Sequence, residues 1–403
     1  MVDEPTQSGP LEGIRIIDLC RLLPGAFATG LLGDMGAEVI KVEQPGVGDP
    51  MRTYQPRLGD TSAFTWVTDR GKRSVALNLR DPRGVEAVRR LVRGADAVVE
   101  SFRPGVADRL GVGYDDLREL NPALVYCSIS GYGADGPLVA EAGHDINYVG
   151  RAGLLSVTGA GGRPALPGVT IADLAGGSLM GIAGLLAALV RAQRTGEGDH
   201  VDVAMTDGAF ALQALTLGAF FAEGRDPGME TELLNGGYPC YNLYECADGR
   251  YLTVGPLEEP FWRELCDAVE RPDLLPTQFD GQAIPLWRDL FATRPRDDWL
   301  ATFAGRDVCV GPLNKVSEAT ADPQLRHRGM ITEQEHETAG PVPQIGTPIK
   351  FRERHAGPRA PAQAVGESTS SVLAAAGYSA DEIERLLDDG VAAGPAAVKA
   401  SDW

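Results

Sequence analysis

The stretch IRIIDLCRLLPGAFATGLLGDMGAEVIKVE, residues 14–43, decides the fold of this chain. It begins with an apolar run, IRIIDL, that is typical of a buried strand, and it ends with a second such run, EVIKVE. Between them, Pro24-Gly25 predicts the start of a helix that continues to about Met35. A strand, a helix and a second strand in this order predict a βαβ unit with parallel strands.

The same alternation continues toward the carboxyl terminus. Asp81-Pro82 supplies an N-cap and a first-turn proline for the helix PRGVEAVRRLV, and the strand-like runs ADAVVE and ALVYCSIS follow, ending at Ser130. This pattern predicts an α/β fold with a Rossmann-like parallel sheet that helices cover on both faces. The uncharged run from Leu174 to Val190 is at the short limit for a membrane span, and we interpret it as a buried helix.

The character of the sequence changes after about Gly224. The segment YNLYECADGRYLTVG has two apolar runs around Ala247-Asp248-Gly249, which predicts a β-hairpin, and helical patterns follow it. We therefore predict a first part of the large α/β domain over residues 1–224 and a small α+β domain over 225–318. A last helix is predicted after Ser379, which forms a capping box with Glu382.

Composition excludes several classes of partner and compartment. The 56 acidic and 37 basic side chains give a formal charge of −19, which repels nucleic acid, although local cations can still hold a small anion. The six cysteines include no CxxC pair, so neither a metal site nor a disulfide framework is predicted. Residues 1–13 show no export signal, and we expect a cytoplasmic protein with reduced thiols that does not enter a membrane.

Two familiar glycine motifs are missing from the places that would need them. The turn after the first strand reads CRLLPGAF and lacks the GxGxxG that brings backbone against a dinucleotide pyrophosphate. Gly176-Gly177-Ser178 is followed by Met180 where a GxSxG nucleophile elbow requires glycine. The glycine cluster at residues 159–162 is interpreted as a loop.

Two residues stand out as candidates for chemistry. His144 is one of only five histidines, and its context AGHDINYVG places Asp145 and Tyr148 within four positions of it. Asp173 precedes the long apolar helix, where it would serve either as an N-cap or as a reactive carboxylate that the helix dipole stabilises. Gly176 and Gly177 weaken the first turn of that helix, which suggests that another group approaches its backbone closely.

These segments, taken together, resemble CoA-transferase family III, also called CaiB/BaiF, and within it most of all the α-methylacyl-CoA racemases. The resemblance runs from Leu11 almost to the last helix. It is carried by LEGIRIIDL, LLGDMGAEVIKVE, GKRSVALNL, SFRPGV, GHDINY, ADLAGGS, NGGYPCY, YECADGRYLTVG and DVCVGPL.

The resemblance implies a fold and a set of site residues. It implies that residues 319–403 return to complete the large domain, and that two subunits interlock as a homodimer with the active site between them. It assigns catalysis to His144, Asp173 and Glu258, with no metal and no cofactor beyond the coenzyme A of the substrate. The remaining expected residues are Asp145, Tyr148, Gly176, Gly177 and Asn235 for support, and Lys41, Leu77, Leu79 and Arg103 for CoA.

The chemistry of a thioester explains why such a set would work. A thioester acidifies its α-carbon because its enolate places charge on oxygen, so a base on one face and an acid on the other invert the centre. His144 and Asp173 would exchange these roles while Glu258 orients the imidazole. Backbone N–H groups near Gly176 and Gly177 would stabilise the enolate oxygen.

Two other interpretations remain open. Transferases of the family also resemble the chain, and in them an aspartate at the position of Asp173 is a nucleophile that carries covalent intermediates. The insert from Gly46 to Arg70 is closer to the transferase pattern, whereas His144 together with Glu258 favours proton transfer. A noncatalytic CoA-binding protein with the same fold is the third interpretation.

Overall fold

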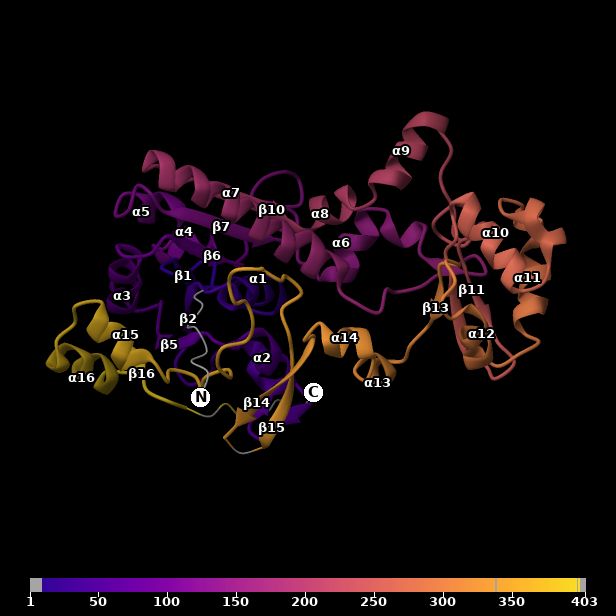
Figure 1. Ribbon diagram of the computed structural model, residues 1–403. Helices are drawn as coiled ribbons and strands as arrows, with labels where there is room; N and C mark the ends of the chain where they lie inside the picture. The colour runs from indigo at the N-terminus through magenta and orange to yellow at the C-terminus, as the bar shows by residue number, and fades with distance from the viewer. Residues whose placement is uncertain (1–8, 338, 397, 399–403) are drawn as a thin grey trace. The chain divides into compact units, whose positions relative to one another are not determined.

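The computed structural model of the chain describes residues 9–337, 339–396 and 398 (Figure 1). Of the segment that we searched for an export signal, residues 1–8 lie outside the described part. Internal contacts group the described residues into two compact units. The first comprises the segment that ends at Ala152, Thr170–Leu212 and the segment that begins at Pro323. The second comprises Gly153–Val169 and Gln213–Asp322.

A parallel sheet forms the centre of the first unit. In the described residues it has seven strands in the order β10-β7-β6-β1-β2-β5-β16, and all neighbours are parallel except the last pair. The strands are β1 (Arg15–Asp18), β2 (Glu38–Glu43), β5 (Arg73–Leu77), β6 (Ala97–Glu100), β7 (Val125–Ser130), β10 (His200–Ala204) and β16 (Ala392–Ala393). The predicted mixed α/β fold with a large parallel-sheet domain is therefore confirmed.

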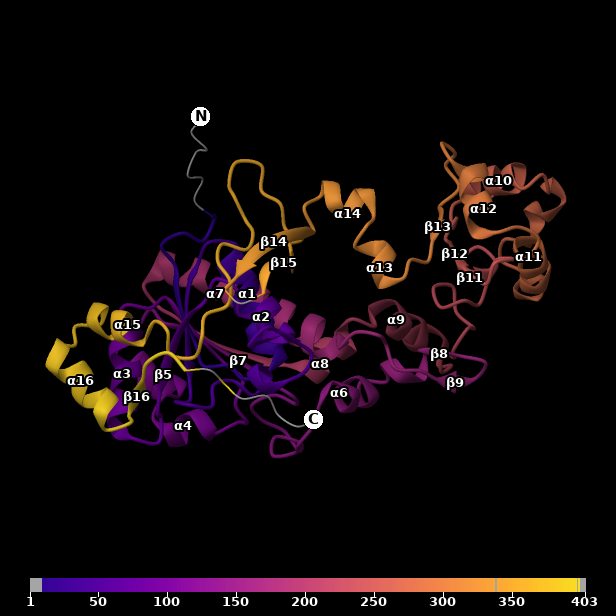
Figure 2. The same ribbon diagram turned by 90° about the horizontal axis from the view of Figure 1, so that it is seen from below.

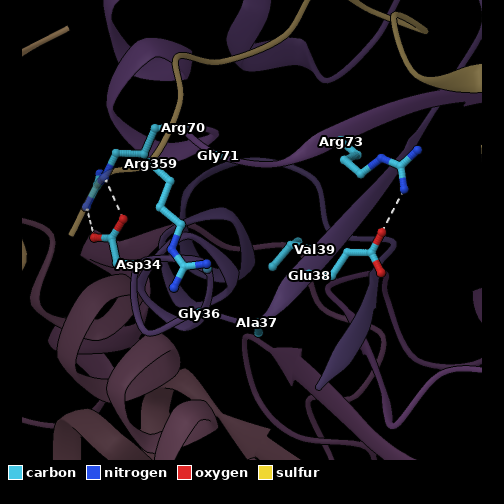
Figure 3. A pocket seen from close by; sticks show the side chains of 10 residues that line it. Asp34, Gly36, Ala37, Glu38, Val39, Arg70, Gly71, Arg73 and Arg359 are labelled. Atoms are coloured by element: carbon cyan, nitrogen blue, oxygen red, sulfur yellow. Dashed lines mark hydrogen bonds and ion pairs between the residues drawn. The ribbon is translucent and has the colours of Figure 1, made fainter. Parts of the chain in front are cut away.

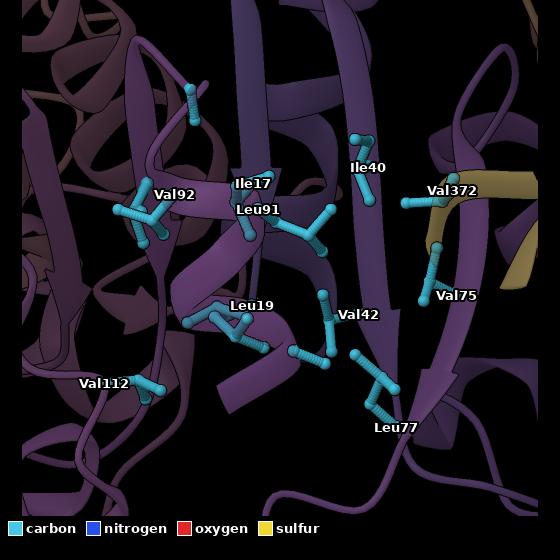
Figure 4. Close-up of a cluster of buried hydrophobic side chains, with 14 of the residues drawn as sticks. Ile17, Leu19, Ile40, Val42, Val75, Leu77, Leu91, Val92, Val112 and Val372 are labelled. Carbon is cyan, nitrogen blue, oxygen red and sulfur yellow. The ribbon is translucent and has the colours of Figure 1, made fainter. Parts of the chain in front are cut away.

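Helices cover both faces of this sheet, as predicted. On one face, α3 (Pro82–Val92), α15 (Thr369–Ala375) and α16 (Ala380–Asp388) enclose an apolar core with side chains of β1, β2 and β5 (Figures 2 and 4). On the other face, α1 (Leu23–Asp34) packs against the helix that ends in α7 (Met180–Thr195). The capping predictions hold, since Asp81 accepts the N–H of Arg83 and Ser379 accepts that of Glu382.

The long apolar helix differs from the prediction in two ways. Its first part, Ala172–Leu179, is π-helical and then continues as α7. It is not fully buried: Gly181, Leu185 and Leu189 face the interior, whereas Val190 is 49% exposed. Among the described residues, only Ala172–Thr195 is long and apolar enough to cross a bilayer, and 39% of its most apolar window is buried.

The other elements of the first unit are short. Their bounds are η1 (Pro50–Thr53), β3 (Arg57–Leu58), β4 (Thr61–Ser62), α2 (Ala63–Thr68), α4 (Val106–Leu110), α5 (Tyr114–Arg118), α6 (Asp145–Arg151), α8 (Met205–Ala211), α14 (Pro323–His327), β14 (Ile331–His336) and β15 (Gly340–Ile345). The antiparallel pair β14 and β15 lies in a segment that we predicted only as proline-rich connections.

The second unit contains an antiparallel sheet and its own core. The predicted hairpin is β11 (Asn242–Glu245) and β12 (Tyr251–Val254), and β13 (Val310–Pro312) pairs with β12. Trp262, Trp287 and Trp299 fill the core between this sheet and its helices. The helices are α9 (Ala214–Glu223), α10 (Glu259–Ala268), α11 (Ile284–Phe291), α12 (Arg296–Phe303) and α13 (Val316–Ala319).

Residues 153–169 belong to this second unit, whereas the prediction had placed them in the first part of the large domain. The glycine cluster within them is a short hairpin of β8 (Gly159–Ala160) and β9 (Arg163–Pro164) instead of an open loop.

Candidate active site

A cleft of about 770 Å³ opens in the first unit at the carboxyl ends of the parallel strands. Its walls include Arg21–Pro24 after β1, Ser101–Pro104 after β6 and Gly131–Gly133 after β7. Ligands of open α/β sheets bind at this edge, because the loops that leave the strands converge there. The cleft is also lined by His144, Asn147, Tyr148 and Asp173, so the structure brings the two predicted reactive residues into one cavity.

Asp173 is the second residue of the π-helical segment, whose N-cap position is Ile171. Asp173 is therefore not the N-cap, and its carboxyl group is available to the cleft. The backbone N–H of Asp173 donates to Oδ1 of Asp145 at 3.0 Å. Burial, together with the charge of Asp145, raises the pKa of Asp173 to about 7, so both of its protonation states are populated at neutral pH.

His144 is the residue before α6, and its side chain is exposed to the cleft. Its backbone N–H donates to Oδ1 of Asn147 at 3.0 Å, which fixes the start of the helix. Asp145, next in the chain, binds the backbone of Asp173. The GHDINY and ADLAGGS segments are thus joined by a direct hydrogen bond.

Tyr148, which also lines the cleft, supports this arrangement. Its hydroxyl donates to the carbonyl of Gly143 at 2.6 Å, and its ring packs edge-to-face on Tyr132 at 5.1 Å. Burial raises the pKa of Tyr148 to about 12, so the phenol stays protonated at neutral pH. A Cβ on Gly143 would lie 2.6 Å from the Tyr148 ring, which explains the glycine before His144.

The two glycines after Asp173 are closely approached by another segment of the protein. A Cβ on Gly176 would lie 2.7 Å from the carbonyl oxygen of Met205, and one on Gly177 would lie 2.9 Å from the Met205 side chain. Both glycines are buried, and neither lines the cleft. The expected close approach is therefore real, and it is the packing of α8. That the N–H groups near these glycines stabilise an enolate stays a prediction.

Two of the predicted CoA contacts, Lys41 and Leu77, are buried in the structure. Nζ of Lys41 is enclosed by Oδ2 of Asp49 at 3.1 Å and the carbonyl of Cys20 at 3.2 Å, and its side chain is 1% exposed. Leu77 is in the core between the sheet and α3, and the half-buried Leu79 packs against the same core. None of the three lines the cleft.

Arg103 lies at the cleft as expected, and it has a companion that the sequence analysis missed. Arg21 lines the same cavity, and both residues are exposed. Within the part of the chain that the structure describes, neither guanidinium takes part in an ion pair. The signal for Arg21 was its place at the end of a parallel strand, since the residues after such strands form the ligand edge.

Two predicted residues lie in the second unit. Glu258 is exposed at the start of α10, where it occupies the N-cap position. Asn235 uses its side chain locally: its Nδ2 donates to the carbonyl of Gly228 at 2.7 Å, and its Oδ1 accepts the N–H of Glu232 at 2.8 Å. The role of Asn235 in this structure is to close a turn.

A second cavity, of about 210 Å³, lies at the amino end of β2 (Figure 3). Its lining includes the ion pairs Arg70–Asp34 and Arg73–Glu38, together with Arg359. It contains none of the predicted site residues, and it faces away from the carboxyl ends of the strands.

Comparison with known proteins agrees with the fold. The family described as CoA-transferase family III matches residues 11–369. The human succinyl-CoA:glutarate CoA-transferase is 33% identical over 95% of this chain and 90% of its own length. The human alpha-methylacyl-CoA racemase is 34% identical over 94% of this chain and 96% of its own length.

Among solved structures, a CAIB/BAIF family protein from Brucella suis superimposes with a TM-score of 0.81 at 31% sequence identity. The match covers 92% of this chain and 100% of that protein. The family match, the two curated relatives and this structure all extend over most of the chain. The chain is a member of CoA-transferase family III, a group of enzymes that includes both CoA-transferases and acyl-CoA racemases.

Proposed function

We propose that the protein is a 2-methylacyl-CoA racemase that moves a proton on and off the α-carbon of an acyl-CoA thioester. The observation that carries this proposal is the presence of His144 and Asp173 in one cleft, with the pKa of Asp173 raised to about 7. A general acid works best when its pKa is near the working pH, because it then holds its proton and can still release it. Asp173 in its ordinary range would be ionised and could not donate.

The reaction needs only proton transfers. The imidazole of His144 removes the α-proton, and the electron pair of the broken C–H bond moves into the thioester carbonyl to form an enolate. The neutral carboxyl group of Asp173 then delivers its proton to the opposite face, and the carbonyl re-forms. The enzyme is left with a protonated imidazole and an ionised carboxylate, which is the state required for the reverse direction, and exchange with solvent restores the first state.

The same proposal includes the partners and the surroundings of the site. The cationic pair Arg21 and Arg103 fits the phosphates of coenzyme A, since guanidinium groups bind phosphate with paired hydrogen bonds. Glu258 is proposed to orient the imidazole, and the active protein is proposed to be a homodimer. A cytoplasmic location is consistent with six cysteines that are all free thiols.

The test uses proton exchange in the absence of any acceptor acid. Wild-type protein is incubated with (R)-2-methylacyl-CoA in deuterated water, and the α-proton and the enantiomer ratio are followed by NMR and chiral analysis. We expect α-deuteration with loss of enantiomeric purity, reduced at least about 100-fold in His144→Ala and in Asp173→Asn. His327→Ala, which changes an exposed histidine outside the cleft, is the control.

A CoA-transferase is the second candidate, and two observations favour it. Relatives of similar identity carry transferase names, among them the acetyl-CoA:oxalate CoA-transferase of Acetobacter aceti at 34% identity. The insert of residues 46–70 contributes Met51, Tyr54 and Phe64 to the cleft. In this mechanism the Asp173 carboxylate attacks the thioester carbonyl and releases the CoA thiolate, which leaves a mixed anhydride.

The two candidates give opposite results in one pair of assays. If hydroxylamine converts Asp173 to a hydroxamate after incubation with acyl-CoA, and no α-deuterium enters the substrate, the racemase proposal is overturned and the transferase replaces it. If deuterium enters and no hydroxamate forms, the transferase is excluded.

A further inference from the structure

The loop that joins β1 to α1 has a backbone conformation that its sequence does not favour. Leu22, the N-cap residue of α1, has φ 64° and ψ −163°, in a region that is nearly reserved for glycine. A leucine is held there at a cost of about 1–3 kcal/mol, and only if its surroundings enforce it. The loop also supplies four successive residues, Arg21–Pro24, to the wall of the cleft.

Asp49 enforces this conformation. Both of its carboxylate oxygens accept the backbone N–H of Leu22, at 3.1 and 3.2 Å. Oδ2 of Asp49 also accepts a hydrogen bond from Nζ of Lys41 at 3.1 Å, and the same Nζ donates to the carbonyl of Cys20 at 3.2 Å. The peptide groups on both sides of Arg21 are therefore held by one ion pair, whose side chains are 1% and 2% exposed.

Asp49 is itself held in place. Its backbone N–H donates to Oε1 of Glu43 at 2.9 Å, and its Oδ1 accepts the N–H of Met51 at 2.9 Å. Glu43 in turn pairs with the guanidinium of Arg52 at 2.7 Å. The insert after β2 is thus tied to the strand, and the carboxylate of Asp49 cannot turn away without breaking several buried, charge-assisted bonds.

The loop conformation also determines how the two free arginines are placed. The hydroxyl of Ser101 accepts the backbone N–H of Arg21 at 2.9 Å and donates to its carbonyl at 3.0 Å. Ser101 is two residues before Arg103, so the loops that carry the two guanidinium groups are joined through one side chain. The backbone conformation at Leu22 is therefore linked through Ser101 to the loop that carries Arg103.

From these contacts we propose that Asp49 is a positioning residue for coenzyme A binding. It acts by holding Leu22 in its positive-φ conformation, which sets Arg21 and Arg103 at the spacing that the phosphates of CoA require. The inference rests on the proposed function only in that the chain must bind CoA. It does not depend on whether the reaction is proton transfer or CoA transfer.

If Asp49 only stabilised the fold, its mutation would give a different result. Substitutions at position 22 distinguish this structural role from the positioning role. Glycine adopts φ near +64° without strain, whereas alanine pays nearly the same penalty as leucine. Leu22→Gly and Leu22→Ala both lose the leucine side chain from the cleft wall. The main difference between them is therefore the backbone conformation that each residue allows.

The experiment measures binding of coenzyme A itself by isothermal titration calorimetry, with folding verified by circular dichroism. We expect Asp49→Asn to weaken binding by about tenfold, the lower part of the range that the strain at Leu22 implies. When Leu22→Gly is added to Asp49→Asn, we expect the double variant to bind CoA within about threefold of the Leu22→Gly single variant. Adding Leu22→Ala to Asp49→Asn is not expected to restore the affinity. Asp34→Asn, which breaks the equally buried pair with Arg70 at the other cavity, is expected to lower stability and leave CoA affinity unchanged.

The possible outcomes are distinct. If Asp49→Asn binds CoA like the wild type, or if glycine and alanine at position 22 rescue equally, the positioning role is overturned while the proposed function stands. If the wild type does not bind CoA, both are overturned. If Asp49→Asn does not fold, the single variants decide: Leu22→Gly is expected to unfold at a higher urea concentration than Leu22→Ala, and the reverse order refutes the inference.

Discussion

At the scale of single residues, Asp173 lowers the stability of the folded protein at neutral pH, because its surroundings disfavour the ionised carboxylate. Its pKa is about 7 in the folded protein, because burial and the charge of Asp145 disfavour ionisation, and the ordinary value is 3.8. Below about pH 4 both the folded and the unfolded chain hold this proton. As the pH rises from 4 to 7, the unfolded chain ionises first, so the folded state loses stability until the folded pKa is passed.

Asp173→Asn removes this penalty, and its effect on stability should depend on pH. We expect the variant and the wild type to have the same free energy of unfolding near pH 4. At pH 8 the variant should be more stable by an amount on the order of 2–4 kcal/mol. Urea unfolding at pH 4, 6 and 8 measures the difference. A difference that is the same at all three values would show that Asp173 is not held neutral by its surroundings.

Arg103 should contribute to the binding of the phosphate-bearing part of the substrate and not to the reacting part. We expect Arg103→Ala to raise the KM for an acyl-CoA by about 10- to 100-fold, which is the worth of one charge-assisted hydrogen bond. The KM for the corresponding acyl-pantetheine, which lacks the nucleotide, should change less than about twofold. Arg194→Ala, at an exposed position on α7, is the control. Equal effects on both thioesters would assign Arg103 to the acyl site.

Site residues could be predicted from the sequence where their local sequence context was unusual, and not where their contacts are with distant residues. His144 and Asp173 stood out as candidates because of the polar groups and glycines around them, their catalytic roles were implied by the family resemblance, and both residues lie in one cleft. Lys41 was expected at CoA from the resemblance and from its charge. The structure buries its side chain, because a central parallel strand is covered on both faces. Its partner Asp49 is eight residues away in an insert whose fold has no periodic pattern.

At the scale of elements, the packing of the π-helical segment on α8 depends on two glycines that touch. A Cβ on Gly208 would lie 2.4 Å from Cα of Gly176, so the two backbones are in direct contact. A pattern of hydrophobic residues predicts a helix here, but it does not predict the wider π turn or the contact. Both arise from the meeting of segments that are far apart in the sequence, whereas the βαβ units and the capping box at Ser379 are local and were predicted.

Gly176→Ala should therefore destabilise the protein, although alanine is the better helix former. The new methyl group would meet the carbonyl oxygen of Met205 at 2.7 Å and the N of Ala209 at 3.0 Å, and neither backbone can move freely. We expect a loss on the order of 1–3 kcal/mol in urea unfolding. Gly33→Ala in α1 is the matched control, since its nearest contact would be an ordinary 3.6 Å to Val39. It is expected to be neutral or stabilising by up to about 1 kcal/mol.

At the scale of the whole molecule, the described chain leaves apolar helical surface uncovered. Every residue of α9 is at least partly exposed, with Leu215 at 74% and Phe221 at 72%. Isolated exposed apolar residues are ordinary, but a helix that is apolar on all sides and has no buried position requires a partner surface. A second copy of the chain is the partner that the resemblance to CaiB/BaiF proteins implies.

We expect light scattering coupled to size exclusion to give a mass near twice the 42.7 kDa of one chain. The double change Leu215→Glu and Phe221→Glu should shift the protein toward the monomer, because each charge would have to be buried without a partner. Val316→Glu places one charge on α13, where the residue is 83% exposed, and should leave the mass unchanged. If the double variant remains a dimer with full activity, α9 is not part of the subunit interface, and the dimer, if present, is formed by other surfaces. If the wild type is a monomer that racemises its substrate, the interlocked homodimer is not required for catalysis, and the site residues of one chain are sufficient.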